Sequence, residues 1–535
     1  MNLLRLGPSL ILRPSRSAIA AIRASARKHL FSSFSMGNYS DPRTVNAIIQ
    51  HQFNFYDNKL RELIPNLASR HAVEFLLYQY DQAQSIFRGG KIDDEMLKQD
   101  WIEVEGLFRR AIKYMVELMC KCRPGVAPRM SNQEAAFSTE ICLALAEEAL
   151  HLAEVSHRAF SLFPNDWTVW IHAQPSDHDF DLRIAGRHES FDVIFFDRVA
   201  RDRAKRSQYL TGQQFDIHTR THASFLDGAF TQSFGMSYQD FIAVISRTIS
   251  QCHPAPKSFP TLFVQRQSVI DAMTEACGKP RAAVELAIQG FTVDPNHLEA
   301  ENRIAYRPKQ ESRAYRRGFF AFPYETGLHL AFSREMAKEC LIFSVNRVCY
   351  RSLPSEWKSQ DTSTALVKLS TAAGQWFEGI VARNLRSLGI VGQRSKGKIK
   401  DADTPLRIPS EVGELDFLGY SPVDNALVLV EAKMVLTGLE APYWRDDIDQ
   451  FVLSKKSFAV KFRKKTSWVA NNFGSISAAL GANSASKLHV AMITIYPCIA
   501  TEMIDDFPCR SLTEFMLDYQ EAGHWPYPEF VSPKI

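Results

Sequence analysis

The most constraining feature of this chain is a short apolar run that ends in charged residues. Residues 427–430 are apolar at every position, and Glu431-Ala432-Lys433 follows directly. Strand side chains alternate between two faces, so an unbroken apolar run indicates a strand that is covered on both faces. Glu431 and Lys433 share one face of this strand. Charges at the end of a buried strand need partners, so the sequence predicts a site there.

A second acid lies on the preceding predicted strand. Residues 413–418 read Gly-Glu-Leu-Asp-Phe-Leu, and a turn signal at 422–425 separates them from residues 427–433. This hairpin pattern predicts that Asp416 lies beside Glu431 on neighbouring antiparallel strands. Carboxylate oxygens suit Mg²⁺ or Mn²⁺, and no ordered pattern of His and Cys ligands indicates zinc.

A third acid is predicted on a helix upstream of the two strands. Residues 366–388 have helical periodicity and end before Gly389. Glu378 lies at the edge of the apolar stripe of this helix, so its carboxylate leaves the helix beside buried surface. The stripe consists of Phe377, Val381, Leu385 and Leu388.

Together these residues resemble the PD-(D/E)XK nuclease superfamily, which has the restriction-endonuclease-like fold. The resemblance covers roughly residues 360–520 and implies an α/β domain with a mixed sheet flanked by helices. It also implies that Glu378, Asp416 and Glu431 bind Mg²⁺ or Mn²⁺ as catalytic residues. In the same way it implies that Lys433 orients or activates the attacking water. The nearer similarity is to the Mrr-like and nuclease-related branches.

The resemblance implies an order of helix, strand, strand, helix and strand. Leu415 stands where the family name has proline, at a position without a metal-binding role, and Glu414 is an accessory candidate. Two other interpretations stay open: a structural salt bridge of Lys433, or a nuclease-type fold with an impaired site. The five elements are expected at 366–388, about 414–420, 427–434, about 444–463 and 488–496.

Basic residues crowd the C-terminal half of the helix expected at 444–463. Such a cluster can neutralise several backbone phosphates, although cations also suit a helix C-terminus without any nucleic acid. Gln450, one turn into this helix, is a candidate contact for phosphate or water, or is simply exposed. Arg394, Lys396 and Lys398 lie in a predicted basic loop at 394–400 that could clamp a duplex or be merely solvated. The basic candidates of the helix are Lys455, Lys456, Lys461, Arg463, Lys464 and Lys465.

Composition places the chain among ordinary globular proteins of two or more domains. It has 535 residues, of which 45% are hydrophobic and 23% charged, and no apolar run approaches the roughly 18 to 20 residues that cross a membrane. Residues 1–40 carry six basic residues and no acid. Without them 57 basic residues face 59 acidic ones, so nucleic-acid affinity must come from local patches.

The same N-terminal stretch bears on the expected compartment. Nine cysteines without regular spacing favour a reducing compartment, and we expect a cytoplasmic protein. The Arg- and Ser-rich residues 1–35 are similar to a mitochondrial presequence, which is the alternative. Met36 is a second candidate start.

The expected organisation has five parts. Residues 1–40 form a disordered extension or targeting segment, 41–350 a mainly α or α+β region of unknown role, and 351–364 a linker. Residues 365–520 form the nuclease-like domain, and 521–535 a C-terminal tail.

The resemblance implies a metal-dependent nuclease acting on DNA, with an N-terminal region that recognises a target or partner, as in restriction, defence or repair enzymes. The alternative is an inactive nucleic-acid-binding or scaffold protein that keeps the fold. No membrane partner is expected, and a homodimer is left open.

Overall fold

The structure is a computed structural model that divides into two compact units. Unit 1 comprises Met1–Gly186 and Asp216–Val367, and unit 2 comprises Arg187–Phe215 and Lys368–Ile535. The described residues are 3–6, 9–87, 95–122, 130–161, 165–172, 180–184, 191–210, 220–252, 261–299, 313–399, 405–438 and 441–530.

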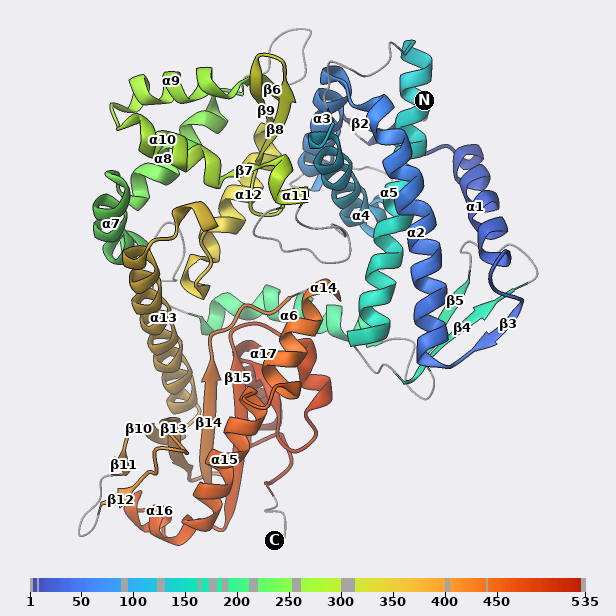
Figure 1. Cartoon of the computed structure of the whole chain (residues 1–535). Coiled ribbons are helices and arrows are strands. Elements are labelled where there is room, and N and C mark those ends of the chain that lie inside the picture. The colour runs from blue at the N-terminus through green and yellow to red at the C-terminus, as the bar shows by residue number, and fades with distance from the viewer. Residues whose placement is uncertain are drawn as a thin grey trace. The chain divides into compact units, whose positions relative to one another are not determined.

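In its described residues, unit 1 combines helices with three small sheets, so it is a mixed α and β unit (Figure 1). Its sheets are a β1–β2 hairpin, a three-stranded β3–β4–β5 sheet and a four-stranded sheet in the order β6–β9–β8–β7. The strands are β1 Leu3–Leu6, β2 Ser9–Leu12, β3 Gly37–Tyr39, β4 Trp167–Ile171, β5 Asp181–Ile184, β6 Thr261–Gln265, β7 Thr292–Val293, β8 Phe319–Tyr324 and β9 Gly327–Ser333. The α-helices are α1 Arg16–Phe31, α2 Pro42–Leu67, α3 Arg70–Phe87, α4 Glu95–Cys120, α5 Asn132–Ser161, α7 Arg220–Phe234, α8 Tyr238–Ser250, α9 Arg266–Cys277, α10 Arg281–Gly290, α11 Pro295–Glu299 and α12 Arg334–Asn346, and the short 3₁₀-helices are η2 Val348–Tyr350 and η3 Ser355–Trp357.

Residues 1–40 were expected as a disordered extension or a targeting segment, and the residues described there include a hairpin and a helix. The hairpin β1–β2 pairs Leu3 with Leu12, and the backbone N–H of Leu12 donates to Gln79 Oε1 at 2.7 Å. Helix α1 buries Ala26 and Leu30 completely. Its apolar residues recur at helical spacing, so one face packs against unit 1 while the arginines stay at the periphery.

The described parts of the segments expected as linker and tail each contain a buried tryptophan. Trp357, within the expected linker 351–364, is 3% exposed and donates from Nε1 to Leu286 O in unit 1. Trp525, within the expected tail, is 5% exposed, and its N–H donates to Asp424 Oδ1 in unit 2. A tryptophan buries a large apolar area, which explains why both segments pack although their overall composition is that of a linker or a tail.

Unit 2 is built on a five-stranded mixed sheet in the order β10–β13–β14–β15–β16. The neighbours β10, β13 and β14 are antiparallel, whereas β14, β15 and β16 run parallel. The strands are β10 Val391–Ser395, β13 Leu415–Ser421, β14 Ala426–Lys433, β15 Lys487–Thr494 and β16 Cys509–Ser511, with a separate pair β11 Lys398–Ile399 and β12 Leu406–Arg407. The predicted α/β class with a mixed sheet is therefore confirmed for this unit.

The hairpin predicted between the two acidic strands is present. Strands β13 and β14 pair in an antiparallel register from Phe417–Val430 to Ser421–Ala426. Asn425 closes the turn with φ of 51°, a left-handed conformation that asparagine tolerates. Every residue of β14 except its last is buried, as the unbroken apolar run predicted.

Helices cover the sheet of unit 2 on both sides (Figure 1). A buried cluster joins Phe377 and Val381 of α13 to Val428 and Val430 of β14. The helical elements are α6 Phe191–Tyr209, α13 Gln360–Ser387, which crosses the unit boundary, α14 Ala441–Ile448, the π-helical turn η4 Asp449–Leu453, α15 Phe458–Asn471, α16 Phe473–Ala479, the 3₁₀-helix η5 Ile499–Met503 and α17 Leu512–Ala522.

The single helix expected over 444–463 is instead interrupted. After α14 and η4 the chain leaves the helix at Ser454, and α15 begins after Ser457, whose side chain accepts from Val460 N at 3.3 Å. A serine N-cap starts a helix by satisfying a free backbone N–H. The basic residues assigned to one helix end therefore divide between a turn and the start of α15.

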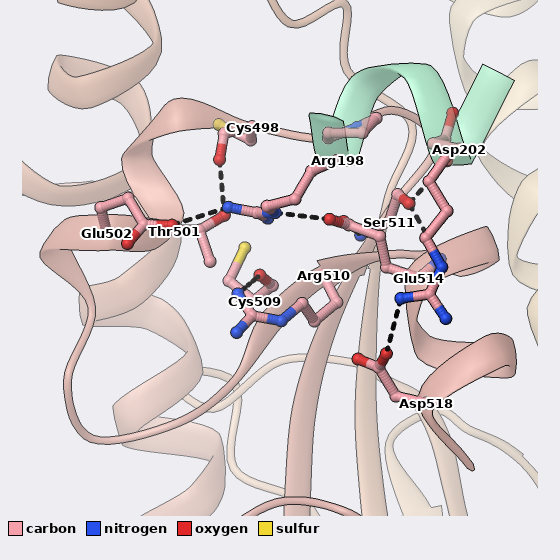
Figure 2. Close-up of polar contacts among 12 residues, drawn as sticks. Arg198, Asp202, Cys498, Thr501, Glu502, Cys509, Arg510, Ser511, Glu514 and Asp518 are labelled. Carbon is pink, nitrogen blue, oxygen red and sulfur yellow. Dashed lines mark hydrogen bonds and ion pairs between the residues drawn. The ribbon is translucent and has the colours of Figure 1, made fainter. Parts of the chain in front are cut away.

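Helix α6 joins unit 2 although it lies far upstream in the sequence, and Figure 2 shows how it is held. Arg198 Nε donates to Glu514 Oε1 and Nη1 to Glu502 Oε1, both at 2.6 Å. Ser511 Oγ donates to the buried Asp202 at 2.7 Å. These contacts attach α6 to α17 and the segment before it.

Among the described residues, none of the helices combines the length and the apolar character that crossing a membrane requires.

Candidate active site

Asp416 and Glu431 lie together at one end of the β13–β14 hairpin. The pair Phe417–Val430 is the last in the ladder, and one more step of this register sets Asp416 opposite Glu431. Asp416 Oδ2 accepts the backbone N–H of Ala432 at 3.0 Å, which fixes its carboxylate against β14. Asp416 is 8% exposed and Glu431 3%. The two acids thus lie side by side, as predicted, and the structure adds that both are buried.

Two ammonium groups hold the Glu431 carboxylate. Lys433 Nζ lies 2.5 Å from Oε1, and Lys465 Nζ of α15 lies 2.6 Å from Oε2. Lys433 Nζ is also 3.8 Å from Asp416 Oδ2. The sequence placed Lys433 on the face of Glu431, and the structure adds that its ammonium bridges both acids.

The environment pushes the pKa values of the two acids apart. Burial and the neighbouring Glu431 carboxylate raise the pKa of Asp416 to about 7. Burial also acts to raise the pKa of Glu431, but Lys433 and Lys465 outweigh it and hold that pKa below its usual value. One carboxylate therefore stays charged while its neighbour can carry a proton near neutral pH, a division that is common in active sites.

Lys433 keeps its charge in this setting. Burial acts to lower the pKa of its ammonium, but Glu431 and Asp416 raise that pKa above its usual value. The ammonium also lies 5.4 Å from the centroid of the Phe458 ring at the start of α15. The site thus presents a charged and mostly buried ammonium next to two acids.

Glu378 belongs to a second pair of acids that Arg394 of β10 connects. Arg394 Nη2 lies 2.7 Å from Glu414 Oε2, and Nη1 lies 3.3 Å from Glu378 Oε2. Burial raises the pKa of Glu378, with Arg394 opposing the rise. Charges of Glu414, Lys433 and Glu431 also act on Glu378, so the two pairs of acids belong to one electrostatic cluster.

This cluster contains more acids than bases. Among the described residues, four carboxylates face three cations, which leaves one excess negative charge when all of these groups are ionised. Glu414 Oε1 is buried and accepts no hydrogen bond from any described residue. A buried excess of negative charge favours the binding of a proton or a cation. The four acids are Glu378, Glu414, Asp416 and Glu431, and the three cations are Arg394, Lys433 and Lys465.

The carboxylate oxygens of the cluster are suitable ligands for Mg²⁺ or Mn²⁺, but these side chains do not point at one common metal position. Carboxylate oxygens are the ligands such ions prefer, and an ion beside Asp416 and Glu431 would relieve their repulsion. Across the described ranges, however, no three His, Cys, Asp or Glu side chains are grouped to hold a metal. The ion pairs of Glu431 and Glu378 occupy oxygens that a metal would need.

The basic candidates of the sequence differ in where they lie. Lys455 and Lys456 lie in the turn between η4 and α15, and Gln450 is exposed on η4. Arg463 pairs with Asp506 at 2.6 Å and is partly neutralised. The remaining exposed candidates are Lys461 and Lys464 on α15, and Lys396 and Lys398 around the start of β11.

Lys465 does not belong with these surface cations. It is 8% exposed and directed at Glu431, so its assignment to a phosphate-binding surface is wrong. Its position in α15 carried the signal, because Phe462 and Val469 lie three residues before it and four after it on the buried face.

Arg394 was also predicted only as part of a basic loop. Residues 391–395 instead form the edge strand β10, paired with β13. No local pattern in the sequence links Arg394 to Glu378 or Glu414, because only the sheet brings these residues together.

Comparison of the chain with protein-family models, with curated proteins and with solved structures finds no match. The functional interpretation therefore depends on the geometry of the site.

Proposed function

We propose that this chain is a metal-dependent nuclease that hydrolyses phosphodiester bonds of DNA, with its site at the end of the β13–β14 hairpin. The observation that carries the proposal is the placement of Asp416 opposite Glu431 with Lys433 between them. The order α13, β13, β14, α15 and β15 also agrees with the helix, strand, strand, helix and strand that the resemblance implies, with β10 as an additional strand after α13. Unit 1 would then serve recognition of a target or partner.

Each residue of the site would have a separate role in the reaction. Asp416, Glu431 and Glu378 would hold Mg²⁺ or Mn²⁺, which when bound lowers the pKa of water and neutralises charge on phosphate. The Lys433 ammonium would donate hydrogen bonds to a phosphate oxygen and stabilise the negative charge that develops there. Lys465 would hold Glu431 in position, because it pairs with the oxygen that Lys433 does not contact.

Exposed cations close to the site would bind the nucleic-acid backbone. Lys461 and Lys464 lie on α15, the same helix that supplies Lys465 to Glu431. Lysine ammonium groups neutralise phosphates without reading sequence. These positions support binding of a duplex backbone across the end of the hairpin.

A second candidate function follows from the same ion pairs. Three cations already neutralise most of the acidic charge, and the described residues offer no preformed group of three metal ligands. A nucleic-acid-binding or scaffold protein that keeps a nuclease-type fold would fit this arrangement. The two functions differ in whether the acids still bind a metal.

Cleavage assays with supercoiled plasmid, linear duplex, single-stranded DNA and RNA, each with Mg²⁺, Mn²⁺ or EDTA, test the proposal. We expect cleavage of DNA that EDTA abolishes. Calorimetry should show millimolar or tighter Mn²⁺ binding that is lost in Asp416→Ala. Intact substrates under every condition, together with equal Mn²⁺ binding by the variant, would favour the binding protein instead.

A further inference from the structure

We propose that Arg394 is an exchangeable counter-ion of the site. Without a metal its guanidinium neutralises Glu378 and Glu414, and when a divalent cation enters it leaves these acids and binds a substrate phosphate. This inference rests on the proposed nuclease function. It assigns Arg394 two alternative partners, the pair of acids in the metal-free site and the substrate phosphate in the metal-bound site.

The contacts of Arg394 are those of an arginine that can change partners. Its two Nη atoms reach two different carboxylates, at 2.7 Å and 3.3 Å, and its side chain is 37% exposed. By contrast, Arg317 of unit 1 grips both oxygens of Glu356 at 2.7 and 2.8 Å and is 1% exposed. Because Arg394 is already partly hydrated, leaving its acids does not strand a buried charge.

The backbone around Arg394 is also suited to such a movement. Strand β10 is the edge of the sheet and pairs only with β13 among the described strands. The register shifts between Gln393 and Ser395, where two residues of β10 span three of β13. Such an irregularity re-aims a side chain and interrupts the ladder, and here it falls at Arg394.

The charges of the cluster give the reason for the exchange. A metal ligated by Glu378 cannot come close while a guanidinium occupies the same carboxylate, because the two cations repel. The four acids and three cations leave one negative charge, so a divalent ion would create one excess positive charge. A phosphodiester neutralises that charge, and the planar guanidinium is well suited to binding its oxygens.

The test compares Arg394→Gln and Arg394→Lys with the wild type, and uses Arg386→Gln as the matched control. Arg386 is an exposed arginine whose guanidinium donates to Gly392 O at 3.1 Å, so its loss removes one nearby charge without touching the acids. Arg394→Gln removes the competing cation, and we expect calorimetry to show Mn²⁺ binding about three- to tenfold tighter than wild type. Arg394→Lys and Arg386→Gln should bind Mn²⁺ within about twofold of wild type.

The second arm measures binding of a DNA duplex with Ca²⁺ and with EDTA. With Ca²⁺ we expect Arg394→Gln to bind about tenfold more weakly, with a salt slope shallower by about one. The DNA affinity of Arg394→Lys should lie between those of Arg394→Gln and wild type, because lysine keeps the positive charge but lacks the two parallel N–H donors of a guanidinium. With EDTA the affinities should agree, because Arg394 then stays on its acids.

Each outcome decides the inference. A purely structural clamp would lower the melting temperature of Arg394→Gln and leave or weaken Mn²⁺ binding, which overturns it. An equal loss of DNA affinity with Ca²⁺ and EDTA also overturns it. If Arg394→Gln does not fold, wild-type DNA affinity of Arg394→Lys with Ca²⁺ overturns it. If the wild-type protein binds no Mn²⁺, the proposed nuclease function fails as well. If the wild-type protein cleaves DNA but the Arg394 variants show none of the expected changes in Mn²⁺ and DNA affinity, only the role of Arg394 is removed.

Discussion

Buried charges are arranged differently in the two units. In unit 1, Arg313 and Glu117 form a closed pair with exposed fractions of 3% and 0%, and the N–H of Ala314 donates to the same carboxylate at 2.8 Å. In unit 2, Asp416 and Glu431 lie side by side and share the ammonium of Lys433. The first arrangement pairs opposite charges, whereas the second places like charges together.

The pKa values express this difference. In unit 1, Arg317 donates two hydrogen bonds to Glu356. These bonds hold the pKa of the Glu356 carboxyl below its usual value, although burial acts to raise that pKa. In the site of unit 2 one acid is shifted down and its neighbour up to about 7. A buried pair of opposite charges compensates part of the cost of burial, whereas a pair of acids that repel each other adds to that cost, which is typical of functional sites.

The largest expected effect tests whether the closed pair of unit 1 is structural. Arg313→Leu would leave Glu117 buried without a counter-ion, and we expect a loss of about 3 to 5 kcal/mol in the free energy of unfolding. Urea unfolding measures the loss. Arg281→Gln, which removes an exposed ion pair with Asp271, is the control and should cost less than about 1 kcal/mol. Similar losses for both variants would show that burial does not distinguish these pairs.

The next effect concerns the site of unit 2. Lys433→Ala removes the ammonium between the two acids, and we expect the cleavage rate to fall by about two orders of magnitude with the fold and most DNA affinity retained. Glu431→Gln should lower the cleavage rate by a similar factor. Lys487→Ala, which removes a surface lysine paired with Glu529, should cut at the wild-type rate. Wild-type cleavage by Lys433→Ala would make this lysine a structural partner only.

A pH series compares two acids within unit 2. The folded pKa of Asp416 is about 7 and its ordinary value 3.8, so between these values the folded chain binds more protons than the unfolded chain. Stability is therefore lost as pH rises through this range. Asp416→Asn should be more stable than wild type at about pH 8, and this advantage should shrink towards about pH 4.

Asp424→Asn is the matched control with the opposite sign. Burial acts to raise the pKa of Asp424, but hydrogen bonds from Ser421 and the N–H of Trp525 hold it below 3.8. Its stabilisation is present above the ordinary value and is lost as pH falls, so Asp424→Asn should be less stable than wild type at neutral pH and equal to it in acid. Parallel pH profiles for the two variants would contradict the contrast.

The smallest effect concerns the surface near the site. Changing Lys461 and Lys464 together to Gln should weaken DNA binding and make the slope of log K against log salt shallower by about two. Lys455 and Lys456 in the preceding turn offer a second pair for comparison. An unchanged slope would mean that these lysines only solvate the helix.

The local features of the candidate site were readable from the sequence. Alternation and an apolar run predicted the strand that carries Glu431, and a turn signal predicted the hairpin that sets Asp416 beside it. The interrupted helix after Ile448 was not predicted, because an apolar stripe continues across Ser457 and a serine N-cap is a weak local signal. The assignment of α6 to unit 2 could not be predicted, since it depends on contacts of Arg198 with residues about 300 positions away.

The sequence by itself determined which residues can carry charge at the end of a buried strand, because side-chain alternation and turn formation are properties of neighbouring residues. Only the tertiary structure decided what each charge faces. Lys465 turned from a surface cation into the buried partner of Glu431, and Arg394 from a loop residue into the link between Glu378 and Glu414. Coulomb interactions depend on distance in space, so the opposite pKa shifts of Asp416 and Glu431 follow from the packing of the sheet and its helices.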